Sequence, residues 1–182
     1  MALACRGVVN GYANGNGTFR FEPSGLSTRA QFTKMAVLGF SLVLLTPEQA
    51  RFSDVPASSF YYSYIEGAAA VGAINGLNRD QCRQLAAAYP CFGPNVPISR
   101  GQAAVLIQRV RSYPLSTLVV ATFADLPPGV FAYAEVEALY QRWVVSGGYC
   151  PGNGEVRCFF PGQSIRRGEL SRILRRSLDL PL

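Results

Sequence analysis

The stretch Phe52-Ser53-Asp54-Val55-Pro56 occurs twice in the chain, the second time as Phe123-Ala124-Asp125-Leu126-Pro127. The same landmarks follow both copies in the same order: an aromatic residue, a glycine turn, a segment ending in Phe and Pro, and an Ile-x-Arg triplet. Gly76 and Gly147 occupy matching places 71 residues apart. A repeat of this length indicates that each unit is one supersecondary element that buries its apolar face against its neighbours.

A third copy at the start of the chain contains only the second half of the pattern. Val9-Asn10-Gly11-Tyr12, Phe21-Glu22-Pro23 and Leu26-Ser27-Thr28-Arg29 match, but no Phe-x-Asp-Val phrase precedes them. We therefore expect a single module of three units, and we expect the first unit to lack its first helix. The units are a partial first unit over residues 1–50, a second over 51–121 and a third over 122–182.

Each full unit is expected to contain two helices joined by a loop. Apolar and aromatic residues between Phe60 and Gly72 recur at intervals of three and four, which predicts a first helix ending near Gly72. Asp54 is a candidate N-terminal cap for that helix. The following Asn75-Gly76 turn is expected to use the positive φ that glycine permits.

Capping boxes predict where the second helix of each unit begins, because a hydroxyl at the cap position stands three residues before Glu or Gln. In the third unit Arg166 replaces the hydroxyl, so we expect that helix start to be less well capped by about 1 kcal/mol, with Ser164 as a substitute. The boxes are Thr28 with Gln31, Ser99 with Gln102, and Arg166 with Glu169.

In each of the three units, an arginine occupies the first turn of the second helix, where the positive end of the helix dipole disfavours a cation. Its repetition suggests a ligand, since guanidinium and free backbone N–H groups together form a site for a carboxylate or phosphate. The alternative is an arginine whose stem covers the Phe-Pro segment while its head lies in water. These arginines are Arg29, Arg100 and Arg167.

Four of the five cysteines form two pairs at matching places, between the glycine turn and the Phe-Pro segment. This placement predicts two disulfides that staple equivalent loops, Cys82–Cys91 and Cys150–Cys158, rather than four unpaired buried thiols. Each closure contributes about 2–3 kcal/mol in the chain-entropy description, and disulfides imply a compartment outside the cytosol. Cys5 is left over. Without histidine or Cys-x-x-Cys spacing, a zinc site is disfavoured.

The longest apolar stretch, Met35 to Leu45, is shorter than the roughly 20 residues that a membrane span requires. We interpret it as a buried helix, and no membrane span is expected. The absence of histidine and of a Gly-x-Ser-x-Gly elbow disfavours catalysis. A glycosidase that uses a pair of carboxylates remains the enzymatic alternative.

The ordered landmarks, ending in Thr28-Arg29-Ala30-Gln31 and Ser99-Arg100-Gly101-Gln102, resemble the S-layer homology repeat of bacterial surface proteins. The resemblance implies a mainly helical module of three helix-loop-helix repeats in a pseudo-threefold bundle, with the first helices at its centre. It also implies that grooves between repeats bind an acidic, often pyruvylated, secondary cell-wall polysaccharide. The stapled loops depart from the shorter family pattern.

By this resemblance the three arginines would contact the sugar acid, and aromatic residues beside the glycine turns would stack on sugar rings. Leu77 stands at the matching place in the second unit and weakens that groove, whereas Gln in place of Glu removes negative charge near the ligand. The implied ligand-binding residues are Arg29, Arg100, Arg167, Thr28, Ser99, Gln31, Gln102, Glu169, Tyr12 and Tyr149. No metal or other cofactor is implied.

The formal net charge of +6 at pH 7 suits an acidic polymer as a partner. Nucleic acid is disfavoured as a partner because the basic residues recur at matching places in the repeats and do not form one continuous stripe. We interpret Arg172, Arg175 and Arg176 as a solvated helix face. The sequence thus predicts a non-catalytic, extracellular anchoring module on the cell surface. The alternative is an assembly module, in which a second copy or another surface protein covers apolar surface left by the missing helix.

Overall fold

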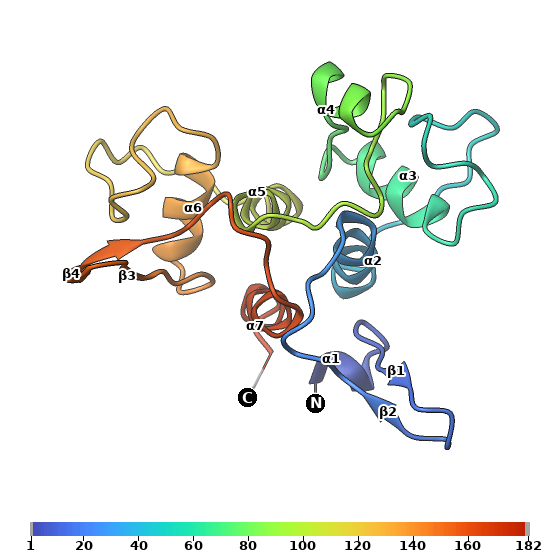
Figure 1. Cartoon of the computed structure of the whole chain (residues 1–182), viewed down its shortest axis with the longest axis horizontal. Helices are drawn as coiled ribbons and strands as arrows, with labels where there is room; N and C mark the ends of the chain where they lie inside the picture. The colour runs from blue at the N-terminus through green and yellow to red at the C-terminus, as the bar shows by residue number, and fades with distance from the viewer. Residues whose placement is uncertain (1, 181–182) are drawn as a thin grey trace.

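The computed structural model describes residues 2–180 and is mainly helical (Figure 1). Two short antiparallel hairpins, one in the first unit and one in the third, are the only sheets in this part of the chain. The helices are α1 (Ala2–Cys5), α2 (Arg29–Gly39), α3 (Tyr62–Ala70), α4 (Arg79–Gln84), α5 (Arg100–Arg111), α6 (Tyr133–Tyr140) and α7 (Arg167–Ser177), and the strands are β1 (Tyr12–Ala13), β2 (Phe19–Arg20), β3 (Gly148–Cys150) and β4 (Asn153–Cys158).

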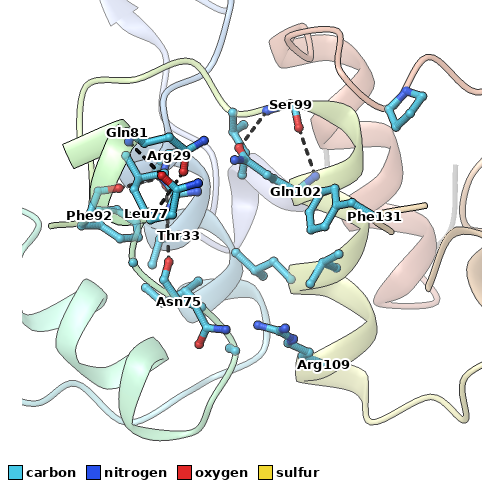
Figure 2. A pocket seen from close by; sticks show the side chains of 18 of the residues that line it. Arg29, Thr33, Asn75, Leu77, Gln81, Phe92, Ser99, Gln102, Arg109 and Phe131 are labelled. Carbon is cyan, nitrogen blue, oxygen red and sulfur yellow. Dashed lines mark hydrogen bonds between the residues drawn. The ribbon is translucent and has the colours of Figure 1, made fainter. Parts of the chain in front are cut away.

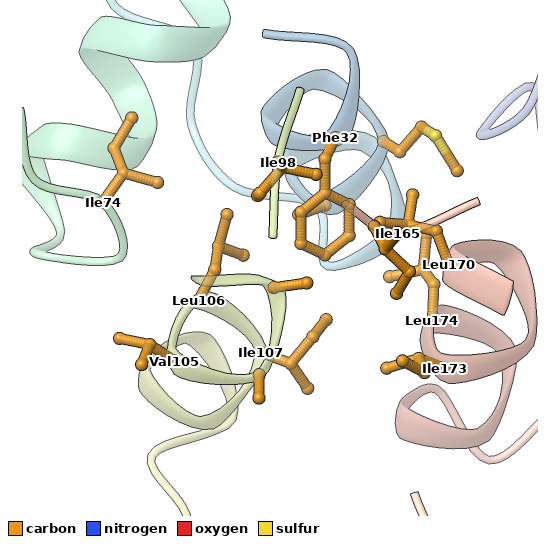
Figure 3. Packing of buried hydrophobic residues seen from close by; sticks show 14 of the residues in the cluster. Phe32, Ile74, Ile98, Val105, Leu106, Ile107, Ile165, Leu170, Ile173 and Leu174 are labelled. Atoms are coloured by element: carbon orange, nitrogen blue, oxygen red, sulfur yellow. The ribbon is translucent and has the colours of Figure 1, made fainter. Parts of the chain in front are cut away.

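The core lies between the second helices of the three units, α2, α5 and α7, which occupy the centre of the molecule in Figure 1. Figure 3 shows Phe32, Ile107 and Leu174, one from each helix, pointing into a shared space beside Ile98 and Ile165. Phe32, Ile107 and Leu174 are fully buried. Because all three helices contribute to one cluster, the units share a core instead of folding around separate ones.

The first helices lie outside this centre, so the expectation that they form the central bundle is wrong. The helix α3 packs on α2, α6 packs on α5, and α1 packs on α7. Each first helix therefore covers the second helix of a different unit. The second helices can fill the centre because they bury residues on more than one face, as α2 does with Phe32, Thr33 and Val37. The aromatic residues Phe60 and Phe131, which precede α3 and α6, remain exposed.

The expectation that the first unit lacks its first helix is wrong in part. The single turn α1 lies against α7, in the relation that α3 has to α2 and α6 to α5. Val8 and Val9 follow α1 and are buried, as Val144 and Val145 are after α6. The apolar surface at this end of α7 thus has at least one turn of helix upon it.

Three backbone segments meet just before the second helices begin. The Ile98 N–H donates to the Ser27 carbonyl at 2.9 Å, the Ile165 N–H donates to the Ile98 carbonyl at 3.0 Å, and the Ser27 N–H donates to the Ile165 carbonyl at 3.4 Å. These hydrogen bonds run from the second unit to the first, from the third to the second, and from the first to the third. They form a closed cycle that leaves none of the three segments as a free edge.

The capping boxes at Thr28 and Ser99 are confirmed, since each hydroxyl accepts from the N–H of Gln31 or Gln102 at 3.2 Å and each amide accepts from the cap N–H. At α7 only half of the box exists, because arginine has no acceptor: Glu169 accepts from the Arg166 N–H at 3.1 Å. Ser164 does not substitute as a cap and instead pairs with Ser99 in a β-bridge.

Asp54 does not cap the first helix, which begins later than expected, at Tyr62, without a side-chain cap. Its carboxylate instead accepts hydrogen bonds from the Phe92 and Gly93 N–H groups, both at 2.7 Å. Asp125 holds the Phe159 and Phe160 N–H groups at the same distances. The repeated aspartate therefore joins the start of a unit to its Phe-Pro segment, which we define as residues 21–23, 92–94 and 159–161.

The glycine of the repeated turn is required for close approach and not for positive φ, so that expectation is wrong. Gly76, Gly147 and Gly11 lie outside the left-handed region, whereas Gly72, at the end of α3, has φ +70°. A Cβ at Gly76 would lie 2.6 Å from the Cys91 carbonyl oxygen and 2.9 Å from Phe52 Cε1. Any side chain there would push the turn off the Phe-Pro segment.

The interpretation of Met35 to Leu45 as one buried helix is wrong beyond Gly39. The helix α2 ends at that residue, and Ser41 then has φ +55°, which turns the chain away from the helix axis. Val43 is 70% exposed. Within residues 2–180, no helix combines the length and the apolar character that crossing a membrane would need.

Both predicted disulfides are confirmed, Cys82–Cys91 with 5.7 Å between the Cα atoms and Cys150–Cys158 with 5.1 Å. Cys5 is an exposed free cysteine. The two stapled loops differ in secondary structure. The loop of the second unit contains the helix α4, which has its own capping box at Asn78, and the loop of the third unit contains the β3–β4 hairpin. Equivalent staples thus enclose different local structures.

The close approach at the repeated turn generates a stability prediction. Replacing Gly76 by Ala should lower the free energy of unfolding by about 2 kcal/mol, because the added methyl meets a backbone carbonyl that cannot move alone. For a domain of this size we expect a fall in melting temperature of roughly 4–8 °C. Gly154→Ala is the matched control, since open space surrounds its Cβ position. Equal melting temperatures for the two variants would contradict the close-approach account.

Candidate functional site

Arg29, at the first turn of α2, reaches across a unit boundary and binds two backbone carbonyl groups. Its Nε donates to the Phe92 carbonyl at 2.8 Å and its Nη2 donates to the Asn75 carbonyl at 3.0 Å. The guanidinium lies over the Phe92 ring, 4.5 Å from the ring centroid. One side chain of the first unit thereby ties together the glycine turn and the Phe-Pro segment of the second.

The other two arginines make the same contacts at the other boundaries. Arg100 donates from Nε to the Phe159 carbonyl at 2.8 Å and from Nη2 to the Ser146 carbonyl at 3.1 Å. Arg167 donates from Nε to the Phe21 carbonyl at 2.9 Å and from Nη2 to the Asn10 carbonyl. The arginines therefore run from the first unit to the second, from the second to the third, and from the third back to the first.

The backbone N–H groups beside Arg29 are also occupied by protein acceptors. The Arg29 N–H donates to the Val96 carbonyl at 2.9 Å, and the Ala30 N–H donates to the Pro94 carbonyl at 3.1 Å. The N–H of the following residue is taken by the Thr28 hydroxyl. The first two N–H groups of α5 and of α7 are likewise bound by carbonyl groups in or just after the next Phe-Pro segment, those of Gln163 and Pro161 at α5 and those of Gly25 and Pro23 at α7. The part of the anion hypothesis that relied on free N–H donors is therefore wrong.

Burial governs the electrostatics of Arg29, whose exposed fraction is 7%. Loss of solvation lowers its pKa to about 10, and the negative charge of Asp54 opposes this shift. Loss of solvation also lowers the pKa of Arg100, while the charges of Glu169 and Asp125 raise it. Arg29 remains protonated at neutral pH, and its Nη1 has no hydrogen-bond partner among residues 2–180.

A groove of about 690 Å³ opens beside Arg29, between α2, α5, the turn at Asn75 and the edge of the third unit (Figure 2). Arg109 of α5 enters the same groove, and the Asn75 amide, oriented so that both its groups are paired, accepts from Arg109 Nη1 at 3.1 Å. We call this the Arg29 groove. It is lined by Arg29, Thr33, Ala73, Ile74, Asn75, Gly76, Leu77, Asn78, Gln81, Phe92, Ile98, Ser99, Gln102, Val105, Leu106, Arg109, Val130, Phe131, Pro161 and Gly162, none of which is acidic.

A smaller groove of about 330 Å³ repeats this arrangement one unit later. Glu169 stands here at the place of Gln102 and accepts from Arg100 Nη1 at 2.9 Å, so the third guanidinium nitrogen is engaged by a carboxylate. We call this the Arg100 groove. It is lined by Arg100, Val144, Ser146, Gly147, Gly148, Phe160, Gln163, Glu169, Arg172, Ile173 and Arg176.

The structure brings some of the expected ligand residues together and separates others. Arg29, Ser99 and Gln102 share the Arg29 groove, while Arg100 and Glu169 share the Arg100 groove. Tyr12 lies 4.9 Å from the Arg167 guanidinium, and Tyr149 is exposed on β3. The expected residues that line neither groove are Thr28, Gln31, Arg167, Tyr12 and Tyr149.

Sequence reasoning missed several groove residues that carry a recognisable signal. Arg109 and Arg176 stand at matching places on α5 and α7, so the repeat itself contained the clue. Gln81 belongs to the capping box of α4, an Asn-x-x-Gln pattern inside the stapled loop. Phe131 is the aromatic landmark that follows the repeated phrase in the third unit, but nothing in the sequence indicates that it lines a groove beside the second unit. Residues 2–180 hold no cluster of three or more potential metal ligands.

The carbonyl contacts of Arg29 predict that its shape matters more than its charge. Arg29→Lys keeps the cation but cannot donate to both carbonyls in fork geometry, so we expect a loss of about 2–3 kcal/mol in the free energy of unfolding. Arg109→Lys, the same change at an exposed position, should alter it by less than about 0.5 kcal/mol. Denaturant unfolding measures both variants. Equal stability of the two would exclude the carbonyl clamp as a stabilising element.

Comparison with known families bears on the same residues. The S-layer homology domain profile matches residues 1–33 and 51–104, and no curated protein matches the chain significantly. The matched stretches contain the Thr28 and Ser99 capping boxes, the first copy of the repeated phrase and the Cys82–Cys91 disulfide. The family is known for modules that anchor proteins to the cell wall. These two stretches, 87 of the 182 residues, match the S-layer homology domain family, and the chain carries two disulfide-stapled loops within its repeats.

Proposed function

We propose that the chain anchors its protein at the cell surface by binding an anionic secondary cell-wall polysaccharide, without catalysis. The observation that carries the proposal is the lining of the Arg29 groove, which holds two arginines and several neutral amides and hydroxyls but no carboxylate. Such a lining favours an anionic ligand through charge-assisted hydrogen bonds. A volume of about 690 Å³ suits one or two sugar rings better than a bare ion.

The groove contains separate charged, amide and aromatic groups, which suit the acid group, the hydroxyl groups and the apolar face of a sugar acid. Arg109 and the unengaged Nη1 of Arg29 supply positive charge for a carboxylate, and Gln81 and Gln102 supply amides for hydroxyl groups. Phe131, which is 61% exposed, presents an apolar face at the edge. Because Nε and Nη2 of Arg29 are already bound to carbonyl groups, the guanidinium loses little further freedom when a ligand arrives.

The two grooves are proposed to differ in affinity for an anion. In the Arg100 groove, Glu169 places a negative charge beside Arg100 and reduces its attraction for a sugar acid. In the Arg29 groove the matching residue is the neutral Gln102. We therefore assign the main site to the Arg29 groove, and we assign a weaker one to the Arg100 groove.

We further propose that the three units, over residues 1–50, 51–121 and 122–182, form one pseudo-threefold module. The closed cycle of hydrogen bonds through Ser27, Ile98 and Ile165 supports this arrangement, as do the three equivalent arginine contacts. The two disulfides support an extracellular location, because they persist only in an oxidising compartment.

The buried carboxylates support binding without turnover, since backbone N–H groups already occupy them. Glu66 accepts from the Arg51 N–H and Glu137 accepts from the Thr122 N–H, both at 2.8 Å. Carboxylates that serve as general acid or base need access to a substrate. The four acidic groups that hold backbone in this way are Asp54, Asp125, Glu66 and Glu137.

The test is charge reversal in the groove without disturbance of the arginine clamp. Arg109→Glu should weaken binding of a pyruvylated secondary cell-wall polysaccharide by roughly tenfold or more, since a favourable charge becomes a repulsive one. Arg83→Glu is the control, because it makes the same change in net charge on the exposed α4, outside the groove lining. Calorimetric titration measures both. If the two variants lose affinity equally, net charge explains the binding and the assigned groove is wrong.

A further inference from the structure

Trp143, the only tryptophan of the chain, occupies a backbone position that favours glycine. It follows the end of α6 and has φ +59°. At the matching places after α1 and α3 the chain has Gly7 with φ +67° and Gly72 with φ +70°. A left-handed residue at the end of a helix is most often glycine, because a Cβ is crowded there. The third unit alone places a large aromatic residue at this point.

Burial does not account for this tryptophan either. Its side chain is 78% exposed. Its nearest aromatic neighbour, Tyr140, lies 6.5 Å away between ring centroids, and no cation of residues 2–180 lies over the indole ring. A single exposed apolar residue is ordinary on a protein surface. Trp143, however, is exposed and also has a backbone conformation that disfavours tryptophan. Neither packing nor backbone preference therefore explains why tryptophan occupies this position.

The surroundings of Trp143 are rich in arginine. Together with α7 and the β3–β4 hairpin it lines a hollow of about 380 Å³, which we call the tryptophan shelf. The one acidic residue there, Asp179, accepts from Arg111 at 3.2 Å. The Arg176 guanidinium makes no hydrogen bond or ion pair with any residue between 2 and 180. The shelf is lined by Tyr140, Arg142, Trp143, Val145, Ser146, Arg157, Arg175, Arg176, Asp179 and Leu180.

This lining has no counterpart in the second unit. The places of Trp143, Arg142 and Arg157 are taken there by Gly72, Val71 and Pro90. Arg6 stands at the place of Arg142 in the first unit, so that cation recurs, but the aromatic face and the Arg157 cation occur together only in the third unit. Cations alone would suffice for a surface that contacts only water, so the exposed aromatic ring calls for another explanation.

We propose that the tryptophan shelf is a second carbohydrate subsite, specific to the third unit, that takes an anionic sugar. The indole face receives the apolar face of the sugar ring, and the arginines receive its acid group. Ser146 and Arg176 line both the shelf and the Arg100 groove, so the two hollows adjoin. The proposal rests on the proposed function, because it assigns the Arg100 groove and the tryptophan shelf to one polysaccharide. Successive sugar units of that polymer would lie in the groove and on the shelf.

Single-stranded nucleic acid would use the same chemistry, since bases stack on aromatic rings and phosphates bind arginine. The disulfides favour the glycan, because they place the protein outside the cytosol. The experiment therefore includes an oligothymidylate as the rival ligand.

The decisive variant is Trp143→Gly, which restores the residue found in the other two units and leaves every arginine in place. If the tryptophan serves a ligand, the melting temperature should stay the same or rise, because glycine suits the backbone. Affinity for pyruvylated secondary cell-wall polysaccharide should fall by roughly two- to tenfold, the size expected for one aromatic contact. Trp143→Tyr should retain most of the binding.

The unaltered protein supplies an independent readout, since its tryptophan emission, excited selectively, comes from one exposed residue. Emission should shift or be quenched as the pyruvylated polysaccharide is added, and should change much less with the depyruvylated polymer or with oligothymidylate. A fall in melting temperature for Trp143→Gly, unchanged affinity, unchanged emission at saturation, or an equal response to oligothymidylate would each overturn the proposal. If Arg109→Glu weakens binding while Trp143→Gly does not, the shelf is wrong and the Arg29 groove stands.

Discussion

The fold depends on one arginine at each unit boundary that donates to two backbone carbonyls of the neighbouring unit. At the first boundary, Arg29 binds the Phe92 and Asn75 carbonyls, while Asp54 binds the Phe92 N–H from the other side. Buried peptide groups without partners are costly, so the Phe-Pro segment has satisfied polar groups only when both units are folded. Because the contacts close into a cycle, loss of one boundary weakens the arrangement of all three units.

This constraint explains why a cation stands at the start of each second helix, against the helix dipole. The carbonyl oxygens of the next unit place partial negative charge beside the arginine. The first two N–H groups of α2 also bind carbonyls of that unit, those of Val96 and Pro94. The Arg29 groove is then a consequence of how two units meet. Its chemistry depends on residues outside the clamp, chiefly Arg109, Gln81 and Gln102, which can differ between boundaries without loss of the fold.

Local patterns allowed the capping boxes at Thr28 and Ser99 and both disulfides to be predicted from the sequence. The central position of α2, α5 and α7 was not predictable, because it depends on which helix buries two faces in the assembled core. The partners of Arg29 and Asp54 were missed for another reason: they are backbone groups 38 to 63 residues away, and a carbonyl or N–H has no sequence signature. Trp143 was visible as a departure from Gly72, but its meaning required the exposure and the φ angle.

The most direct measurement of the central claim is hydrogen exchange of the arginine Nε–H groups by nuclear magnetic resonance. The three arginines whose Nε binds a carbonyl, Arg29, Arg100 and Arg167, should exchange far more slowly than Arg172, which lies exposed on α7. Their protection should persist until the whole chain unfolds, because the clamps hold the units together. Exchange of all four Nε–H groups at the rate of a free arginine would show that the clamps do not hold the repeats, and would contradict the account.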